Sequence, residues 1–329
     1  FTMAVLTLVY GSLSDRYGRR PVLLASILLF ICGCVLAALA DNIWMLIAGR
    51  LIQAAGGACG LSLARTIARD VFGTDGLVKV IAYLLMAYSM GPLVAPPIGG
   101  FLVDGFGWRS VLIFAAVIGG IVGLLSYFTL YETRPAADAS DRRRSLASGY
   151  RQLLGDARFT ALVLQSGLCS GAFFTMATGA SVLMKDYLHR PASEYGLYFM
   201  LFPVGYWLGN LTSSKLSGRV SVETMVLAGS ILLVVTALGF SALVLAGNIV
   251  PLTIFIPGFF ITFAQGIALP NTQAGAIRLA GSLAGTASGI GVFCQLFGAA
   301  LFTQCYGLIA DGTPVPLILV VSIASVLSF

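Results

Sequence analysis

Residues 11–21 read GSLSDRYGRRP and form a short polar interruption between two apolar runs. The stretch holds three arginines, one aspartate, two glycines and a proline. Arginines gathered beside apolar runs are typical of the loops on the cytoplasmic side of a membrane. The stretch therefore predicts a cytoplasmic loop between two membrane-spanning helices, with Pro21 suited to the first turn of the second helix.

The composition of the whole chain supports a membrane environment. Of its 329 residues, 58% are apolar and 10% are charged, and the mean hydropathy is +0.95. Soluble globular chains are about 25% charged, so this chain cannot cover a water-facing surface of its size. The composition excludes a soluble enzyme, a nucleic-acid reader or a disordered chain, and it predicts a multi-span protein whose main partner is the lipid bilayer.

Polar breaks divide the chain into eleven apolar segments. A spanning helix needs about 20 residues, so the first segment is too short and the last runs into the end of the chain. We expect nine full spans, two truncated ones, and an N-terminal part preceding Phe1. The segments are 1–11, 21–40, 44–68, 79–103, 109–131, 158–183, 195–217, 222–246, 249–273, 282–309 and 314–329.

The basic residues predict the orientation of these spans. With 11–21 in the cytoplasm, fifteen Lys and Arg residues fall on the inner side and three on the outer side, as the positive-inside rule requires. We expect an N-terminal bundle at 1–131, a cytoplasmic linker at 132–157 and a C-terminal bundle at 158–329. The arginine run at 142–144 fits a solvated linker, with contact to anionic lipid headgroups as the alternative.

All six cysteines lie in apolar runs and are expected to be free, buried thiols rather than metal or redox sites. They are Cys32, Cys34, Cys59, Cys169, Cys294 and Cys305.

The stretch at 11–21 also resembles the signature loop between the second and third helices of the major facilitator superfamily. The resemblance implies an all-α membrane protein of two pseudo-symmetric six-helix bundles, here truncated at both ends. An ordinary basic loop explains the arginines, but not the glycines, aspartate and proline together. The resemblance also implies a conformational switch, in which Asp70 pairs with Arg19. Its residues are Gly11, Asp15, Arg16, Gly18, Arg19, Arg20 and Asp70.

The sequence RLIQAAGG at 50–57 matches the arginine–glutamine–glycine pattern in the fourth span of that superfamily. An arginine inside a span costs about 2.5–3.5 kcal/mol on insertion scales. Arg50 therefore either snorkels outward or faces a central cavity and responds to proton or substrate occupancy. We place Arg50, Gln53 and Tyr88 in this coupling region.

The sequence GPLVAPPIGG at 91–100 resembles the glycine–proline motif of drug–proton antiporters. We expect it to bend its helix and leave a flat seam that controls closure between the halves. A kinked helix without functional meaning is the alternative. The motif residues are Gly91, Pro92, Pro96, Gly99 and Gly100.

Shorter matches resemble the Bcr/CflA multidrug-resistance subfamily. They are RTIARD at 65–70, GWR at 107–109, ET at 132–133 and GTASG at 285–289. The subfamily resemblance implies a multidrug exporter of the bacterial inner membrane.

Relatives in that subfamily carry an acidic residue in the first helix, which is a candidate proton carrier. The thirteen acids of this chain all fall in loops or at membrane edges in the predicted topology. We therefore expect the carrier to precede Phe1, with Asp15 and Asp104 as alternatives. His189 is expected to be solvated in an outer loop.

The substrate site is expected among polar and aromatic residues of the second half. An aromatic wall with scattered amides suits bulky apolar or cationic compounds better than a sugar, although such residues also serve interhelical packing. The candidates are Gln165, Phe173, Tyr206, Trp207, Asn210, Gln265, Asn271 and Gln295.

Together these features predict a monomeric exporter that exchanges a drug-like molecule for protons by alternating access. It would use the proton gradient and need no cofactor or metal. A metabolite or sugar facilitator would share the loop at 11–21 but not necessarily the motif at 91–100. A membrane enzyme or receptor would need a cluster of catalytic acids, histidines or metal ligands, and the sequence offers none.

Overall fold

The computed structural model describes the backbone of residues 1–133, 151–247, 249–280 and 283–329. Within these ranges it leaves undescribed the side chains of residues 8, 11, 12, 15, 61, 62, 65, 69, 72–89, 284 and 285. The regular structure of the described residues is helical, apart from an isolated bridge between Ser217 and Val220. The chain divides into two compact units.

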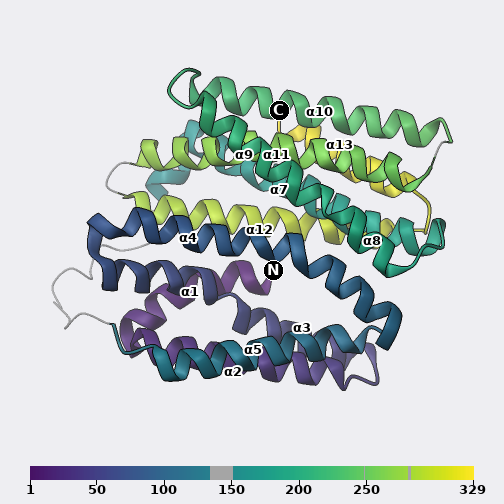
Figure 1. The fold of residues 1–329 in the computed structure, drawn as a ribbon. Helices are drawn as coiled ribbons and strands as arrows, with labels where there is room; N and C mark the ends of the chain where they lie inside the picture. The colour runs from purple at the N-terminus through teal and green to yellow at the C-terminus, as the bar shows by residue number, and fades with distance from the viewer. Residues whose placement is uncertain (134–150, 248, 281–282) are drawn as a thin grey trace. The chain divides into compact units, whose positions relative to one another are not determined.

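The first unit comprises Phe1–Gly91 and Phe101–Arg142. Within it, α2 packs against α1, α3 and α5 (Figure 1). The helices that contribute to this unit are α1 (Thr2–Tyr17), α2 (Arg19–Ala38), α3 (Ile43–Gly57), most of α4 (Gly60–Phe106) and α5 (Arg109–Thr129).

The second unit comprises Pro92–Gly100 and Arg143–Phe329. Its centre is α11, which packs against α7, α9, α10 and α12 around a continuous apolar core (Figure 1). A short π-helix, η1, extends α7. The elements are α7 (Ala157–Val182), η1 (Leu183–Tyr187), α8 (Ala192–Phe199), α9 (Leu201–Leu216), α10 (Val222–Leu245), α11 (Pro251–Ala280), α12 (Ala284–Ile309) and α13 (Val315–Leu327).

Local chemistry explains where several helices begin. The side chains of Asn42, Asp156 and Ser221 accept hydrogen bonds from backbone N–H groups in the first turns of α3, α7 and α10. These bonds satisfy donors that have no partner inside the helix. Gly18 separates α1 from α2 with φ of +99°, a conformation that disfavours any residue with a Cβ.

Four of the predicted segments are wrong. The loop expected at 11–21 is helical except at Gly18, because α1 continues to Tyr17 and α2 starts at Arg19. The span expected at 44–68 breaks after Gly57, and the loop expected between 68 and 79 lies within α4. The span expected at 195–217 is split between α8 and α9 at Met200. Pro21 does lie in the first turn of α2, as predicted.

Glycines allow several helices to pack backbone to backbone. A Cβ on Gly33 or Gly56 in the first unit would collide with the facing backbone of α3 or α2, and one on Gly209 would collide with Phe263 of α11. Lipid tails are as apolar as leucine, so helices in a membrane associate through such close contact rather than through the hydrophobic effect.

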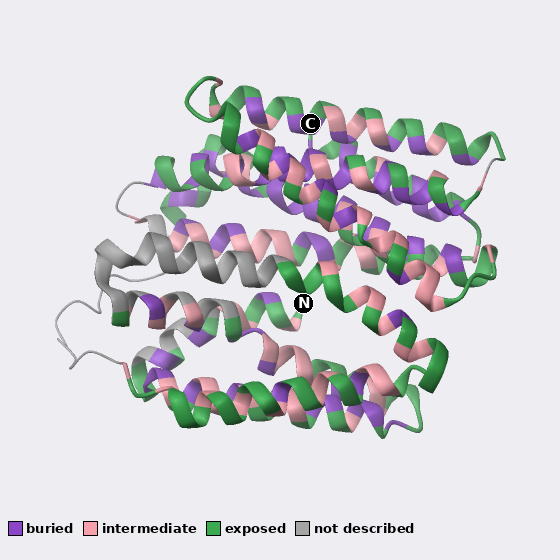
Figure 2. Ribbon diagram, viewed as in Figure 1, coloured by how far each residue is buried: buried purple, intermediate pink, exposed green. Residues whose placement is uncertain are grey.

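Six helices in the described part of the chain are long and apolar enough to span a membrane, and α3 and α13 are shorter apolar helices. Only 11% of the apolar window of α5 is buried, against 67% for α11. Figure 2 shows α5 exposed along much of its length. The helix α5 therefore presents an apolar surface that suits lipid.

The six cysteines are free, as predicted, but they are not all buried. Cys32 and Cys305 are exposed and Cys294 is half-buried. The prediction failed because an apolar run in a membrane protein indicates a spanning helix without indicating which of its faces is covered.

Candidate functional site

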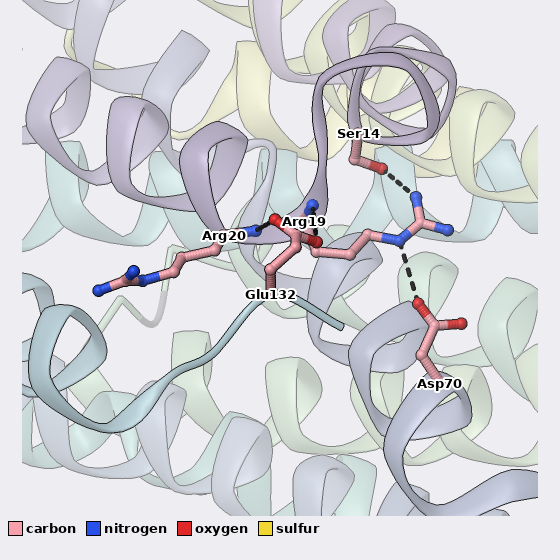
Figure 3. A network of polar contacts seen from close by, with 5 residues as sticks. All are labelled: Ser14, Arg19, Arg20, Asp70 and Glu132. Atoms are coloured by element: carbon pink, nitrogen blue, oxygen red, sulfur yellow. Dashed lines mark hydrogen bonds and ion pairs between the residues drawn. The ribbon is translucent and has the colours of Figure 1, made fainter. Parts of the chain in front are cut away.

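A buried ion pair lies at the junction of α1 and α2. Nε of Arg19 donates to Oδ2 of Asp70 at 3.1 Å, and the two side chains are only 5% and 3% exposed (Figure 3). Nη1 of Arg19 also donates to Oγ of the buried Ser14 at 2.6 Å. The predicted pairing is present, and Asp70 lies inside α4 rather than in a loop, with its carboxylate buried.

Glu132 completes the start of α2 from a distant part of the sequence. Its Oε1 accepts from the backbone N–H of Arg19 at 2.9 Å, and its Oε2 accepts from the backbone N–H of Arg20 at 3.2 Å (Figure 3). A carboxylate at a helix N-terminus is stabilised by these donors and by the helix dipole. A Cβ on Gly18 would lie 2.6 Å from Oε2 of Glu132, so the glycine also makes room for this cap.

Two other residues of the predicted switch, Arg20 and Arg16, have described side-chain contacts. Nη2 of Arg20 donates to the carbonyl oxygen of Tyr127 at 2.8 Å, which ties α2 to the last turn of α5. Arg16 is exposed and lies over the ring of Tyr17. Gly11 and Asp15 both belong to α1, but the surroundings of Gly11 and the side chain of Asp15 are not described.

Arg50 and Gln53 form a short polar chain in the first unit. Nη1 of Arg50 donates to Oε1 of Gln53 at 2.7 Å, and Nε2 of Gln53 donates to Sγ of the buried Cys34 at 3.0 Å. Arg50 remains exposed near the middle of α3, held on one side by Gln53. The side chain of Tyr88, the third residue expected in this region, lies outside the described residues.

Arg109 joins two helices of the first unit, a role that the sequence did not predict. Arg109 donates from Nε to the carbonyl oxygen of Ala38 at 3.1 Å and from Nη2 to that of Ala40 at 2.8 Å. Its guanidinium also lies 4.5 Å from the ring centroid of Trp108. The GWR sequence at 107–109 was the only signal for this contact, which ties the start of α5 to the end of α2.

The motif at 91–100 packs against α8 within the second unit. A Cβ on Gly100 would collide with the backbone of Ala192, and a Cβ on Gly196 would collide with the backbone of Pro96. The two glycines therefore let α4 and α8 meet without side chains between them. The expected seam does not include every glycine of the motif, since a Cβ on Gly91 or Gly99 would meet nothing within 4 Å. Pro92 and Pro96 lie inside the helix with these glycines.

Three of the expected substrate-site amides join helices of the second unit to one another. Gln165 on α7 donates to Oγ of Ser230 on α10 at 3.1 Å. Gln265 on α11 donates weakly to Ser170 on α7, and Asn271 on α11 donates to Oγ of Ser213 on α9 at 2.8 Å. Gln165 and Gln265 are buried. These contacts serve interhelical packing, which was the alternative for such residues.

The other candidates are spread over three helices. Phe173 packs edge-on to Phe174 and Phe202 at the border of the core. Trp207 is 61% exposed, whereas Tyr206 and Asn210 beside it on α9 are half-buried. Asn210 donates to the carbonyl oxygen of Tyr206, and Nε2 of Gln295 on α12 is buried without a partner in the described structure. The structure does not gather these residues with the three amides into one pocket among the described residues.

The described residues contain no group of three or more metal-ligating side chains. A hollow of about 500 Å³ lies against α10 and α11, and its lining is almost entirely apolar. The candidate functional features of the described residues are therefore close glycine contacts between helices and hydrogen bonds between helices.

Six long apolar helices in the described part of the chain are typical of a multi-pass membrane protein. The model of the Major Facilitator Superfamily matches residues 1–303. The chain belongs to this superfamily. It is a secondary transporter and not an enzyme.

Comparisons with individual proteins agree with this assignment. The chain is 30% identical over 298 residues to multidrug resistance protein D of Escherichia coli, covering 88% of this chain and 72% of that protein. It is 24% identical over 300 residues to a bicyclomycin resistance protein homolog of Haemophilus influenzae, covering 88% and 73%.

Solved structures establish the fold. A POT family transporter in complex with 5-aminolevulinic acid has a TM-score of 0.76 at 12% identity, covering 99% of this chain and 84% of that one. A D-xylose-proton symporter has a TM-score of 0.74 at 13% identity, covering 100% and 84%. The all-helical fold is thereby confirmed.

Proposed function

We propose that the protein exports drug-like small molecules across the bacterial plasma membrane in exchange for protons. Relatives at 24–30% identity are named for multidrug and bicyclomycin resistance. Their names support export of drug-like compounds over transport of a sugar or metabolite.

The observation that carries the proposal is the glycine seam between Pro92–Gly100 and α8. A seam without side chains can be tight in one state and separate in another, because no interdigitated side chains must be withdrawn. In the proposed cycle this seam is closed when the substrate site faces the cytoplasm, and it separates to release the substrate outward. The switch at the start of α2 is proposed to stabilise the opposite, cytoplasm-closed state.

The proton carrier is proposed to be a carboxylate whose pKa changes between the two states. Asp70 is not a good candidate, because Arg19 holds its buried carboxylate in a charge-assisted hydrogen bond. Arg50 is proposed to respond to substrate or to the carrier, since its guanidinium is exposed and tied only to Gln53 among the described residues.

The seam is tested by a pair of alanine variants on the same helix. Gly100→Ala places a methyl group against the backbone of α8, whereas Gly105→Ala places one where nothing lies within 4 Å. In cells that express the protein, we expect Gly105→Ala to retain drug efflux and Gly100→Ala to lose it, with both variants present in the membrane. Equal efflux by the two variants would contradict a role for the seam. Absence of efflux by the unmodified protein, across drugs of several charge classes, would contradict the proposed function.

A further inference from the structure

A guanidinium without a counter-ion lies at the corner where α2 begins and α5 ends. Arg20 donates to the Tyr127 carbonyl and lies 5.3 Å from the Tyr127 ring centroid. No carboxylate in the described part of the chain forms an ion pair with its guanidinium, and its Nε is buried without an acceptor. Figure 3 shows the guanidinium pointing away from Glu132, whose carboxylate is occupied by backbone N–H groups.

A second polar atom close in sequence to the end of α5 also lacks a partner in the described structure. Oγ1 of Thr133, which directly follows the capping residue Glu132, is buried with no hydrogen bond in the described structure. Tyr127 supplies the one hydrogen-bond acceptor of the Arg20 side chain among the described residues, so the guanidinium retains N–H donors for a polar partner.

Exposed aromatic residues lie at this end of α5 and just beyond it. Tyr127, Phe128 and Tyr131 are 56%, 75% and 64% exposed. They follow the exposed apolar face of α5, which includes Leu124 and Leu125. Aromatic rings at the end of an apolar, lipid-facing helix lie at the level of the lipid headgroups. The positive-inside excess of arginines places this end of α5 at the cytoplasmic leaflet, where anionic lipids are concentrated.

We propose that this corner, formed by Arg20, Tyr127, Phe128 and Tyr131, binds the phosphate of an anionic phospholipid. The arginine fork matches a phosphate oxygen pair in geometry and in charge. The acyl chains would lie along the apolar face of α5. Bound lipid would hold together the start of α2 and the end of α5, which already meet through the Arg20–Tyr127 contact.

The test is a lipid titration of the purified full chain, with bound lipids counted by native mass spectrometry. The probes are dioleoyl phosphatidylglycerol and, for comparison, dioleoyl phosphatidylcholine. We expect Arg20→Gln to weaken the first phosphatidylglycerol binding step by about fivefold, the usual effect of one basic residue at a charged membrane, with phosphatidylcholine unaffected. Arg278→Gln removes the same charge from an exposed position in the last turn of α11 and should leave binding unchanged.

Arg20 also holds the end of α5, so a second variant separates lipid binding from folding. Tyr127→Leu keeps the carbonyl that accepts from Arg20 but removes the exposed ring, and we expect about a two- to threefold loss of phosphatidylglycerol binding. Three results would overturn the proposal: equal binding of the two lipids by the unmodified chain, equal losses in Arg20→Gln and Arg278→Gln, or wild-type binding in both Arg20→Gln and Tyr127→Leu.

Discussion

The Arg19 guanidinium lies 3.1 Å from the Asp70 carboxylate, and both side chains are almost completely buried. A buried charge without its partner is costly, whereas an apolar pair of similar volume is often tolerated. The pair therefore joins the start of α2 to α4, and its structural and functional contributions can be separated by substitution.

Asp70→Asn removes the negative charge and leaves the Arg19 guanidinium buried. We expect the free energy of unfolding to fall by about 3–5 kcal/mol, which thermal unfolding of the detergent-purified protein would measure. The double variant Arg19→Met with Asp70→Leu should recover most of this stability while transport remains lost. Recovery of transport in the double variant would show that the pair has only a structural role.

Glu132→Ala removes the cap of α2 supplied from beyond the end of α5. We expect a loss of about 1–2 kcal/mol, comparable to that of other N-terminal caps. Glu223→Ala is the matched control, because Glu223 is exposed in the first turn of α10 and Ser221 supplies the cap there. A difference of less than about 0.5 kcal/mol between the two variants would mean that the Glu132 contacts contribute little.

Gly18→Ala tests the space and the backbone conformation at the same junction. The positive φ of Gly18 and the nearby Glu132 carboxylate both oppose a side chain, so we expect a cost of about 1–3 kcal/mol. Gly120→Ala on α5 meets nothing within 4 Å and should be neutral or stabilising. Chemical denaturation gives the free energy of unfolding of each variant. Equal values for the two variants would contradict the claim that a glycine is required at position 18.

Arg109→Lys tests the contact between the start of α5 and the end of α2. Lysine keeps the charge but cannot reach the carbonyls of Ala38 and Ala40 with the same fork. We expect a loss of about 1–2 kcal/mol from the missing hydrogen bond and ring contact. Arg190→Lys should change stability by less than about 0.5 kcal/mol, because Arg190 is half-exposed and forms a 3.8 Å pair with Glu194. Similar melting temperatures for the two variants would show that the Arg109 contacts with Ala38 and Ala40 do not stabilise the protein.

The sequence predicted the helical membrane fold and the Arg19–Asp70 pair, because both follow from local patterns and a specific resemblance. It did not predict the Glu132 cap, since that contact joins residues far apart in the chain and a single carboxylate carries no signal of its partner. It also misplaced the boundaries around 11–21 and within α4. Charged and glycine-rich residues suggested loops there, but α4 continues through its stretch, and only Gly18 separates α1 from α2.

It was harder to predict whether an individual side chain points toward another helix or toward lipid than to predict the helices themselves. The candidates Gln165, Gln265 and Asn271 turned out to connect helices of the second unit. Hydropathy does not distinguish a lipid-facing position from a helix-facing one, because both surroundings are apolar. For the same reason the exposure of Cys32 and Cys305 was not foreseen.

The most direct test of the account is drug-for-proton exchange by the purified full-length protein in liposomes that enclose a pH-sensitive dye. We predict that imposing a gradient of a neutral, drug-like substrate drives protons across the membrane in the opposite direction, and that dissipating the proton gradient stops drug accumulation. Drug movement without proton movement, or movement of both in the same direction, would contradict the proposed antiport.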